Sequence, residues 1–184
     1  MKPSVKVALV SVLISISLAL IMLYLNLNTL WFSSSNFIHI FLLLTSIAVG
    51  LFLTKKVTAF AQLHFLEDIK IAMQGGMMYV IFMGFFIYYY HSSLDTSIVD
   101  TKRLEWIQSI EENVPNEQVY LELQEKDPTW RGKSYLDYIE NQHDSVYAFI
   151  SAKSIAIANV VAGLFLTLFF SIFSVLILRK AVLR

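Results

Sequence analysis

The sequence predicts an all-α membrane protein with four transmembrane helices and a small helical extramembrane domain between the third and the fourth. Two observations lead to this fold class. First, 57% of the 184 residues are hydrophobic, above the roughly 45–50% of soluble domains. Second, residues 92–150 contain 12 acidic and 5 basic residues, a net charge of −7, whereas the remainder of the chain carries +7. The chain therefore divides into apolar, basic segments that suit lipid and one acidic segment that suits water.

The first two apolar segments cover about residues 7–25 and 37–54. A helix of roughly 20 residues crosses a hydrocarbon core about 30 Å thick, so both are predicted spans. The linker between them, residues 26–36, contains no charged residue. The first segment could instead be a signal peptide, but the apolar core of cleavable signals is only about 7–15 residues long. We therefore expect it to remain in the protein as a helix.

The other two apolar segments cover about residues 71–90 and 154–178. The third contains Gln74 and the pair Gly75–Gly76, which indicate either a tight helix crossing or a break near its start. Since no acidic or basic residue lies inside any span, we expect Asp68, before the third span, to reach water at the membrane surface.

The acidic segment between the third and fourth spans is predicted to be helical. Asp100–Thr101 resembles a helix N-terminus, and Pro115 ends that helix. A second helix is predicted from Asn116 to about Lys126. From Lys133 onward the apolar residues keep a helical period, without proline, so we expect one helix of about 45 residues, roughly 65 Å long, that continues into the fourth span.

The lysine and arginine residues near the spans predict the orientation, because such residues remain cytoplasmic. An even number of spans places eight of them on one side: Lys2, Lys6, Lys55, Lys56, Lys70, Arg179, Lys180 and Arg184. We therefore predict a multi-pass protein of the bacterial inner membrane with both termini in the cytoplasm. Its parts are residues 1–91 (three spans), 92–150 (periplasmic) and 151–184 (fourth span and basic tail).

The residues that commonly carry chemistry do not form a recognisable catalytic or metal-binding pattern. Glu140 and His143 have the Glu-x-x-His spacing of di-iron bundles, but such sites need a second copy and further glutamates, so a solvated helix face is the better interpretation. His39 and His91 are expected to make interfacial hydrogen bonds. The sequence has neither an HExxH pair, a GxSxG motif nor a phosphate-binding loop. We expect no catalytic residues, no cofactor, no metal and no nucleic-acid partner.

Small and polar residues inside the spans favour close helix packing. Ser11 and Ser15 share one helix face, as do Asn159 and Gly163. We expect these four residues to pack within the membrane, with Asn159 as an interhelical hydrogen-bonding group. A functional polar site at Asn159 is the alternative.

Four aromatic residues of the acidic segment are candidate partner-binding residues: Trp106, Tyr120, Trp130 and Tyr135. Partly exposed aromatic side chains are typical anchors of protein interfaces. The alternative is that they form a small core that joins the helices. The sequence favours a non-catalytic accessory or scaffolding subunit that contacts a membrane protein, or further copies of itself, through these helices. The alternative is a small transporter or channel component.

The run from His64 through Gly76 (HFLEDIKIAMQGG), together with the four-span layout, resembles a family of small bacterial inner-membrane proteins known as domain of unknown function 4199. The resemblance covers nearly the whole chain in layout, but the matching motif is short. This chain lacks the proline expected soon after the third span, where it reads Ser92–Ser93–Leu94–Asp95. The resemblance implies the same topology and compartment and assigns no site residues.

Overall fold

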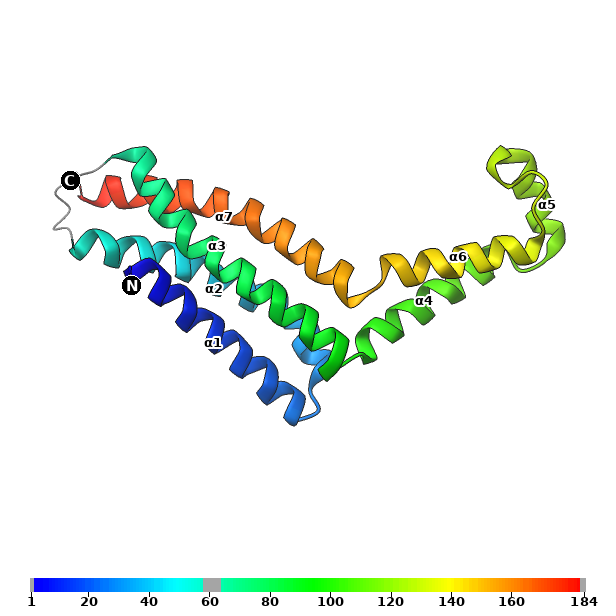
Figure 1. Cartoon of the computed structure of the whole chain (residues 1–184), viewed down its shortest axis with the longest axis horizontal. Helices are drawn as coiled ribbons and strands as arrows, with labels where there is room; N and C mark the ends of the chain where they lie inside the picture. Colours follow the sequence, from blue (N-terminus) through cyan, green and yellow to red (C-terminus); the bar gives the residue numbers. More distant parts are fainter. Residues whose placement is uncertain (1, 58–63, 183–184) are drawn as a thin grey trace. The chain divides into compact units, whose positions relative to one another are not determined.

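Among the residues that the structure describes, four helices are long and apolar enough to cross a membrane. The computed structural model describes residues 2–57 and 64–182, which form helices and short connections without a strand. The four helices are α1 (Pro3–Tyr24), α2 (Asn28–Val57), α3 (Phe65–Tyr89) and α7 (Ala152–Val182) (Figure 1). The prediction of an all-helical chain with four helices able to span a membrane is confirmed.

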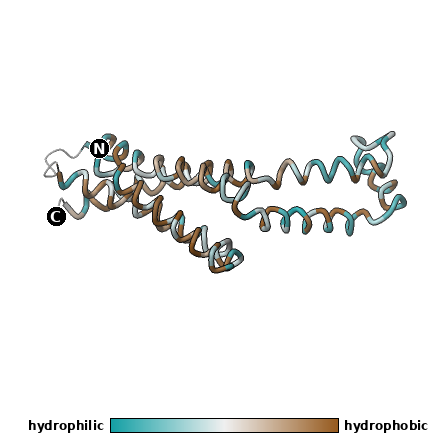
Figure 2. Tube along the Cα trace, turned by 60° about the horizontal axis from the view of Figure 1, so that its bottom comes forward, coloured by the Kyte–Doolittle hydropathy of each residue, from teal (hydrophilic) through white to brown (hydrophobic). Residues whose placement is uncertain are grey.

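The chain forms two compact units. The first, here called the bundle, consists of Met1–Tyr88 and Ala156–Arg184, and the second, here called the polar unit, is Tyr89–Ile155. The polar unit contains a π-helical turn η1 (Tyr90–Leu94), the helices α4 (Ser97–Asn113), α5 (Glu117–Lys126) and α6 (Tyr135–Phe149), and the short 3-10 helix η2 (Pro128–Trp130). Figure 2 shows that the four long helices are mainly hydrophobic, whereas hydrophilic residues dominate the helices of the polar unit.

Helix α2 begins earlier than the sequence predicts. It starts at Asn28, so the expected linker over residues 26–36 is wrong. The connection is a tight turn in which Asn26 has a left-handed backbone with φ of 56°, and such a residue commonly ends a helix. Ser33 and Ser34 donate hydrogen bonds to the carbonyls of Thr29 and Leu30, one turn earlier. The serines are therefore accommodated within the helix.

The prediction of one continuous helix from residue 133 into the fourth span is wrong. Helix α6 ends at Phe149 and α7 begins at Ala152. Ser151 occupies the gap, and its side chain accepts a hydrogen bond from the Ser154 backbone N–H at 3.1 Å. A serine in this position caps a new helix and competes with continuation of the old one.

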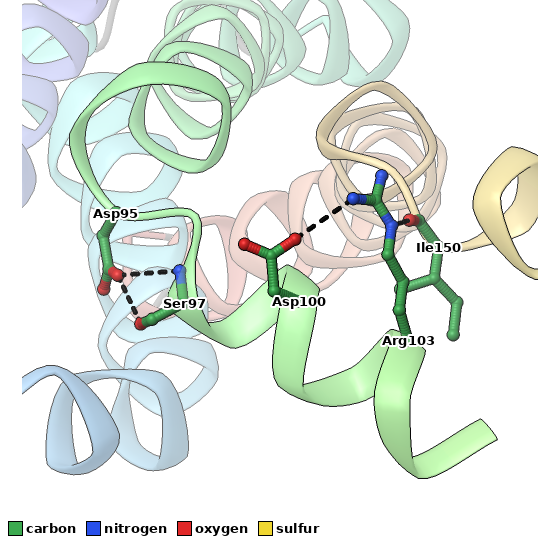
Figure 3. Close-up of polar contacts among 5 residues, drawn as sticks. All are labelled: Asp95, Ser97, Asp100, Arg103 and Ile150. Atoms are coloured by element: carbon green, nitrogen blue, oxygen red, sulfur yellow. Dashed lines mark hydrogen bonds and ion pairs between the residues drawn. The ribbon is translucent and has the colours of Figure 1, made fainter. Parts of the chain in front are cut away.

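Arg103 of α4 stabilises the C-terminal end of α6 within the polar unit. Its Nε donates a hydrogen bond to the Ile150 carbonyl at 2.7 Å, and a second nitrogen lies 3.2 Å from the Asp100 carboxylate (Figure 3). The guanidinium also lies over the Tyr147 ring, 4.9 Å from its centroid. A positive charge is favourable at a helix C-terminus, where carbonyls lack helical partners. Arg103 thereby joins α4 to α6.

Helix α4 begins at Ser97, so the predicted start at Asp100–Thr101 is wrong. Asp95 is the reason, because its carboxylate accepts a hydrogen bond from the Ser97 backbone N–H at 3.1 Å (Figure 3). The prediction of a helix from Asn116 to about Lys126 is confirmed, and the Asn116 side chain accepts a hydrogen bond from the Val119 backbone N–H.

In the bundle, α3 and α7 approach closely at three glycines. A Cβ atom on Gly76 would lie 2.5 Å from Thr167 Cγ2. A Cβ on Gly163 would lie 2.8 Å from Val80 Cγ2, and one on Gly84 would collide with Val160. Side chains of each helix therefore fill the spaces that glycines leave in the other. Since α3 is continuous through Gly75 and Gly76, this pair is a tight crossing and not a break.

Helix α1 packs through a face of small residues. Its buried residues include Ser4, Ala8, Ser11, Ser15 and Ala19. A Cβ atom on Gly50 of α2 would lie only 3.0 Å from the Cα of Ser4. Small residues at three- and four-residue spacing let helix backbones approach and gain van der Waals contacts in lipid.

We predict that Gly76→Val destabilises the bundle, because the new side chain would overlap Thr167 and Ile47. Overpacking of this kind typically costs about 1–3 kcal/mol. Thermal unfolding of the purified protein in detergent, followed by circular dichroism, measures the effect. The control is Ala158→Val, at an exposed position of α7. Equal unfolding temperatures for the two variants would show that the close approach at Gly76 is unnecessary.

Candidate functional site

The bundle contains a pocket of about 360 Å³ that is lined by α2, α3 and α7. This volume lies within the range of roughly 300–1,000 Å³ that small-molecule sites occupy. Four polar side chains contribute to the lining: Asn36 and His39 from α2, Tyr79 from α3 and Asn159 from α7. The remaining lining residues are apolar or glycine. The pocket thus combines an apolar wall with a few polar groups, as ligand sites commonly do.

His39 is held in place by two hydroxyl groups. Its Nδ1 lies 3.1 Å from Ser15 Oγ and 3.0 Å from Tyr79 Oη. The edge of the His39 ring also packs against Trp31, with 5.9 Å between the ring centroids. Ser15 and Tyr79 are buried, with 0% and 2% of their surface exposed. The orientation of the imidazole is therefore fixed by contacts with α1, α2 and α3.

The helix hairpin formed by α1 and α2 explains why Ser15 and His39 meet. Ser15 lies nine residues before the end of α1, and His39 lies eleven residues after the start of α2. Two antiparallel helices joined by a tight turn bring such positions to the same level. Tyr79 reaches them because it belongs to the buried face of α3 that also includes Ala72, Gly76 and Met83.

The four predicted packing residues lie in three different surroundings. Ser11 and Ser15 are buried on the inner face of α1, and Ser15 contacts His39. Gly163 lies against Val80. Asn159 is half-buried and lines the pocket, so its predicted role in interhelical hydrogen bonding stays a prediction.

Sequence reasoning missed the contribution of Tyr79 and assigned His39 only an interfacial role. Both residues lie within helices that are long and apolar enough to span a membrane. A polar ring inside an apolar span is itself a signal, because such groups are costly in lipid unless they are partnered. That signal points to His39 and Tyr79 individually, but only the structure shows that they meet.

A second buried polar group is the ion pair between Lys55 of α2 and Asp68 of α3. Only 4% of Lys55 and 0% of Asp68 is exposed. The expectation that Asp68 reaches water is therefore wrong. A carboxylate without a partner would be strongly unfavourable in this position, so Lys55 compensates its charge and joins α2 to α3.

Three of the four predicted partner-binding residues belong to a small core of the polar unit. Tyr120 is 1% exposed, and Trp130 and Tyr135 pack against the cluster that it forms with Val114 and Tyr138. Tyr135 Oη donates a hydrogen bond to the Val114 carbonyl at 3.0 Å, and burial raises the pKa of Tyr138. Trp106, in contrast, is 54% exposed. A partner-binding role for the four residues stays a prediction.

Within residues 2–57 and 64–182, no group of three or more histidine, aspartate or glutamate side chains could hold a metal ion. His143 Nε2 instead lies 3.5 Å from a carboxylate oxygen of Glu111. This contact joins α6 to α4 on a partly exposed face of the polar unit.

The chain matches no family model, no curated protein and no solved structure. Its resemblance to the domain of unknown function 4199 family therefore stays a prediction.

We predict that removing either partner of the buried ion pair is more harmful than removing both. Lys55→Met and Asp68→Leu should each lower the free energy of unfolding by about 3–5 kcal/mol, because each leaves one buried charge without a partner. The double variant should recover most of that loss. Lys56→Met is the matched control, because Lys56 is exposed. Losses in the single variants that simply add in the double variant would contradict this interpretation of the pair.

Proposed function

We propose that the protein is a non-catalytic accessory subunit of an assembly in the bacterial inner membrane, which it contacts through the helices of the polar unit. The observation that carries the proposal is the exposure of large apolar side chains on these helices. Leu104, Trp106, Leu121 and Leu136 are 66%, 54%, 54% and 76% exposed. Contiguous apolar patches on a polar surface commonly mark contacts with another protein.

The acidic residues within the polar unit favour a partner of opposite charge. Residues 92–150 carry a net charge of −7, so a basic surface is attracted and a second acidic unit is repelled. The preferred partner is therefore a membrane protein with a basic surface outside the membrane. A homo-oligomer would instead form through the lipid-facing sides of the spans.

The proposed orientation follows from the distribution of lysine and arginine. Both termini lie in the cytoplasm and the polar unit lies in the periplasm, because the basic residues that flank the spans remain on the cytoplasmic side. The four apolar helices support a multi-pass arrangement, and an even number of crossings returns the C-terminus to the side of the N-terminus.

A small transporter or channel component is the second candidate. The pocket among α2, α3 and α7 favours it, because transport requires polar groups that converge between helices. Purified protein reconstituted alone into vesicles distinguishes the two candidates. A transporter would carry a solute across the membrane unaided, whereas an accessory subunit would not.

We predict that reporter fusions reveal this orientation. Alkaline phosphatase, which is active only outside the cytoplasm, should be active when fused after Asn36 or Asp127. It should be inactive when fused after His64 or Arg184, where a fluorescent protein should fold instead. Phosphatase activity after Arg184 or His64 would exclude the proposed arrangement.

We predict that Trp106→Ser lowers the recovery of a defined partner in mild detergent by at least tenfold, because a central aromatic anchor commonly contributes about 2 kcal/mol or more. Recovery should also fall as the salt concentration rises. Gln108→Ser is the control, since Gln108 is exposed on the same helix. The helix content of both variants checks the fold. Equal recovery of the partner by the two variants would mean that the contact is made elsewhere.

A further inference from the structure

We infer that the pocket among α2, α3 and α7 binds an uncharged, membrane-soluble molecule through a carbonyl group. This inference concerns the bundle and does not depend on partner binding by the polar unit. It rests on three features of the pocket: its lining is uncharged, it extends along α3, and His39 has a second ring nitrogen that can contact a ligand.

The lining excludes a charged ligand. None of the residues that line the pocket is Lys, Arg, Asp or Glu. A phosphate, carboxylate or ammonium group would therefore lose its hydration without gaining an opposite charge, which is strongly unfavourable in an apolar environment. A neutral molecule that is already dissolved in the bilayer loses no such hydration.

The pocket extends along α3. On this helix its lining runs from Tyr79 to Ile87, eight residues or about 12 Å along the helix axis. A ring or a chain segment of that length fits the pocket, and the rest of a longer molecule would extend into the lipid.

The polar lining offers hydrogen-bond donors to a carbonyl oxygen. His39 Nδ1 is already engaged by Ser15 and Tyr79, so Nε2 is the ring nitrogen that a ligand can reach. When Nδ1 accepts a hydrogen bond from one of the two hydroxyls, the neutral imidazole carries its proton on Nε2 and donates from there. The amide of Asn36, an exposed residue of the lining, supplies a second donor group.

Quinones and neutral glycerides are two kinds of membrane-soluble molecule that carry a neutral carbonyl on an apolar body. Decylubiquinone and dioctanoylglycerol represent them, and decylbenzene is the control without a carbonyl. Each compound is titrated into the purified full-length protein in detergent, and the shift of the unfolding temperature is measured. Binding to the folded state alone raises that temperature with ligand concentration.

Three variants separate the ligand site from general stability. His39→Phe keeps a ring but removes the Nε2 donor, and Ala162→Leu places a larger side chain at a lining position. Ala158→Leu is the matched control, because Ala158 lies one turn earlier on α7, is exposed and does not line the pocket. Circular dichroism and gel filtration of each variant without ligand verify that it is folded.

We expect at least one carbonyl compound to bind wild-type protein and Ala158→Leu with equal affinity. His39→Phe and Ala162→Leu should each weaken that binding at least tenfold. Binding of decylubiquinone alone identifies a quinone ring as the ligand group, and binding of dioctanoylglycerol alone identifies an ester. Binding of both supports the shared carbonyl chemistry. The inference is overturned if neither binds, if decylbenzene binds equally well, or if Ala162→Leu binds like the wild type.

Discussion

Close approach of helix backbones at small residues is the constraint on which the bundle depends. In lipid, helices gain little from hydrophobic burial against one another, so van der Waals contact between well-fitted surfaces must hold them together. Gly76 and Gly163 provide that fit between α3 and α7, because Thr167 and Val80 occupy the space that a Cβ would need. Ser4 and Gly50 do the same between α1 and α2. The pocket lies among the same helices, and its lining includes Val80 and Gly163.

The same constraint explains where the polar side chains lie. Polar groups that face lipid are costly, and two sets of them are paired inside the bundle. Lys55 and Asp68 neutralise each other between α2 and α3. Ser15, His39 and Tyr79 form a neutral hydrogen-bonded cluster among α1, α2 and α3. The first group joins α2 to α3, whereas the second orients an imidazole at a pocket that a ligand could enter.

The polar unit is stabilised differently, because polar groups on its surface can form hydrogen bonds with water. Its core is small and aromatic, centred on Tyr120 and Tyr138, and side-chain caps stabilise the starts of α5 and α6. Ser134 and Asp137 form a reciprocal cap at the start of α6, and hydrogen bonds from the Ser134 backbone and side chain hold the pKa of Asp137 below its usual value. With so few residues needed for the core, Trp106 and several leucines remain exposed.

The sequence by itself determined the number of long apolar helices, the position of the polar segment and the helix over Glu117–Lys126. These features depend on composition along the chain and on local signals such as Asn116 and Pro115. Only the tertiary structure decided which polar residues meet. His39 and Tyr79 are 40 residues apart, and no local pattern encodes their contact. The same holds for Asp68, whose burial depends on Lys55 of another helix, and for the break at Ser151. There, a side-chain cap and the distant Arg103 replace the backbone hydrogen bonds that a continuous helix would have made.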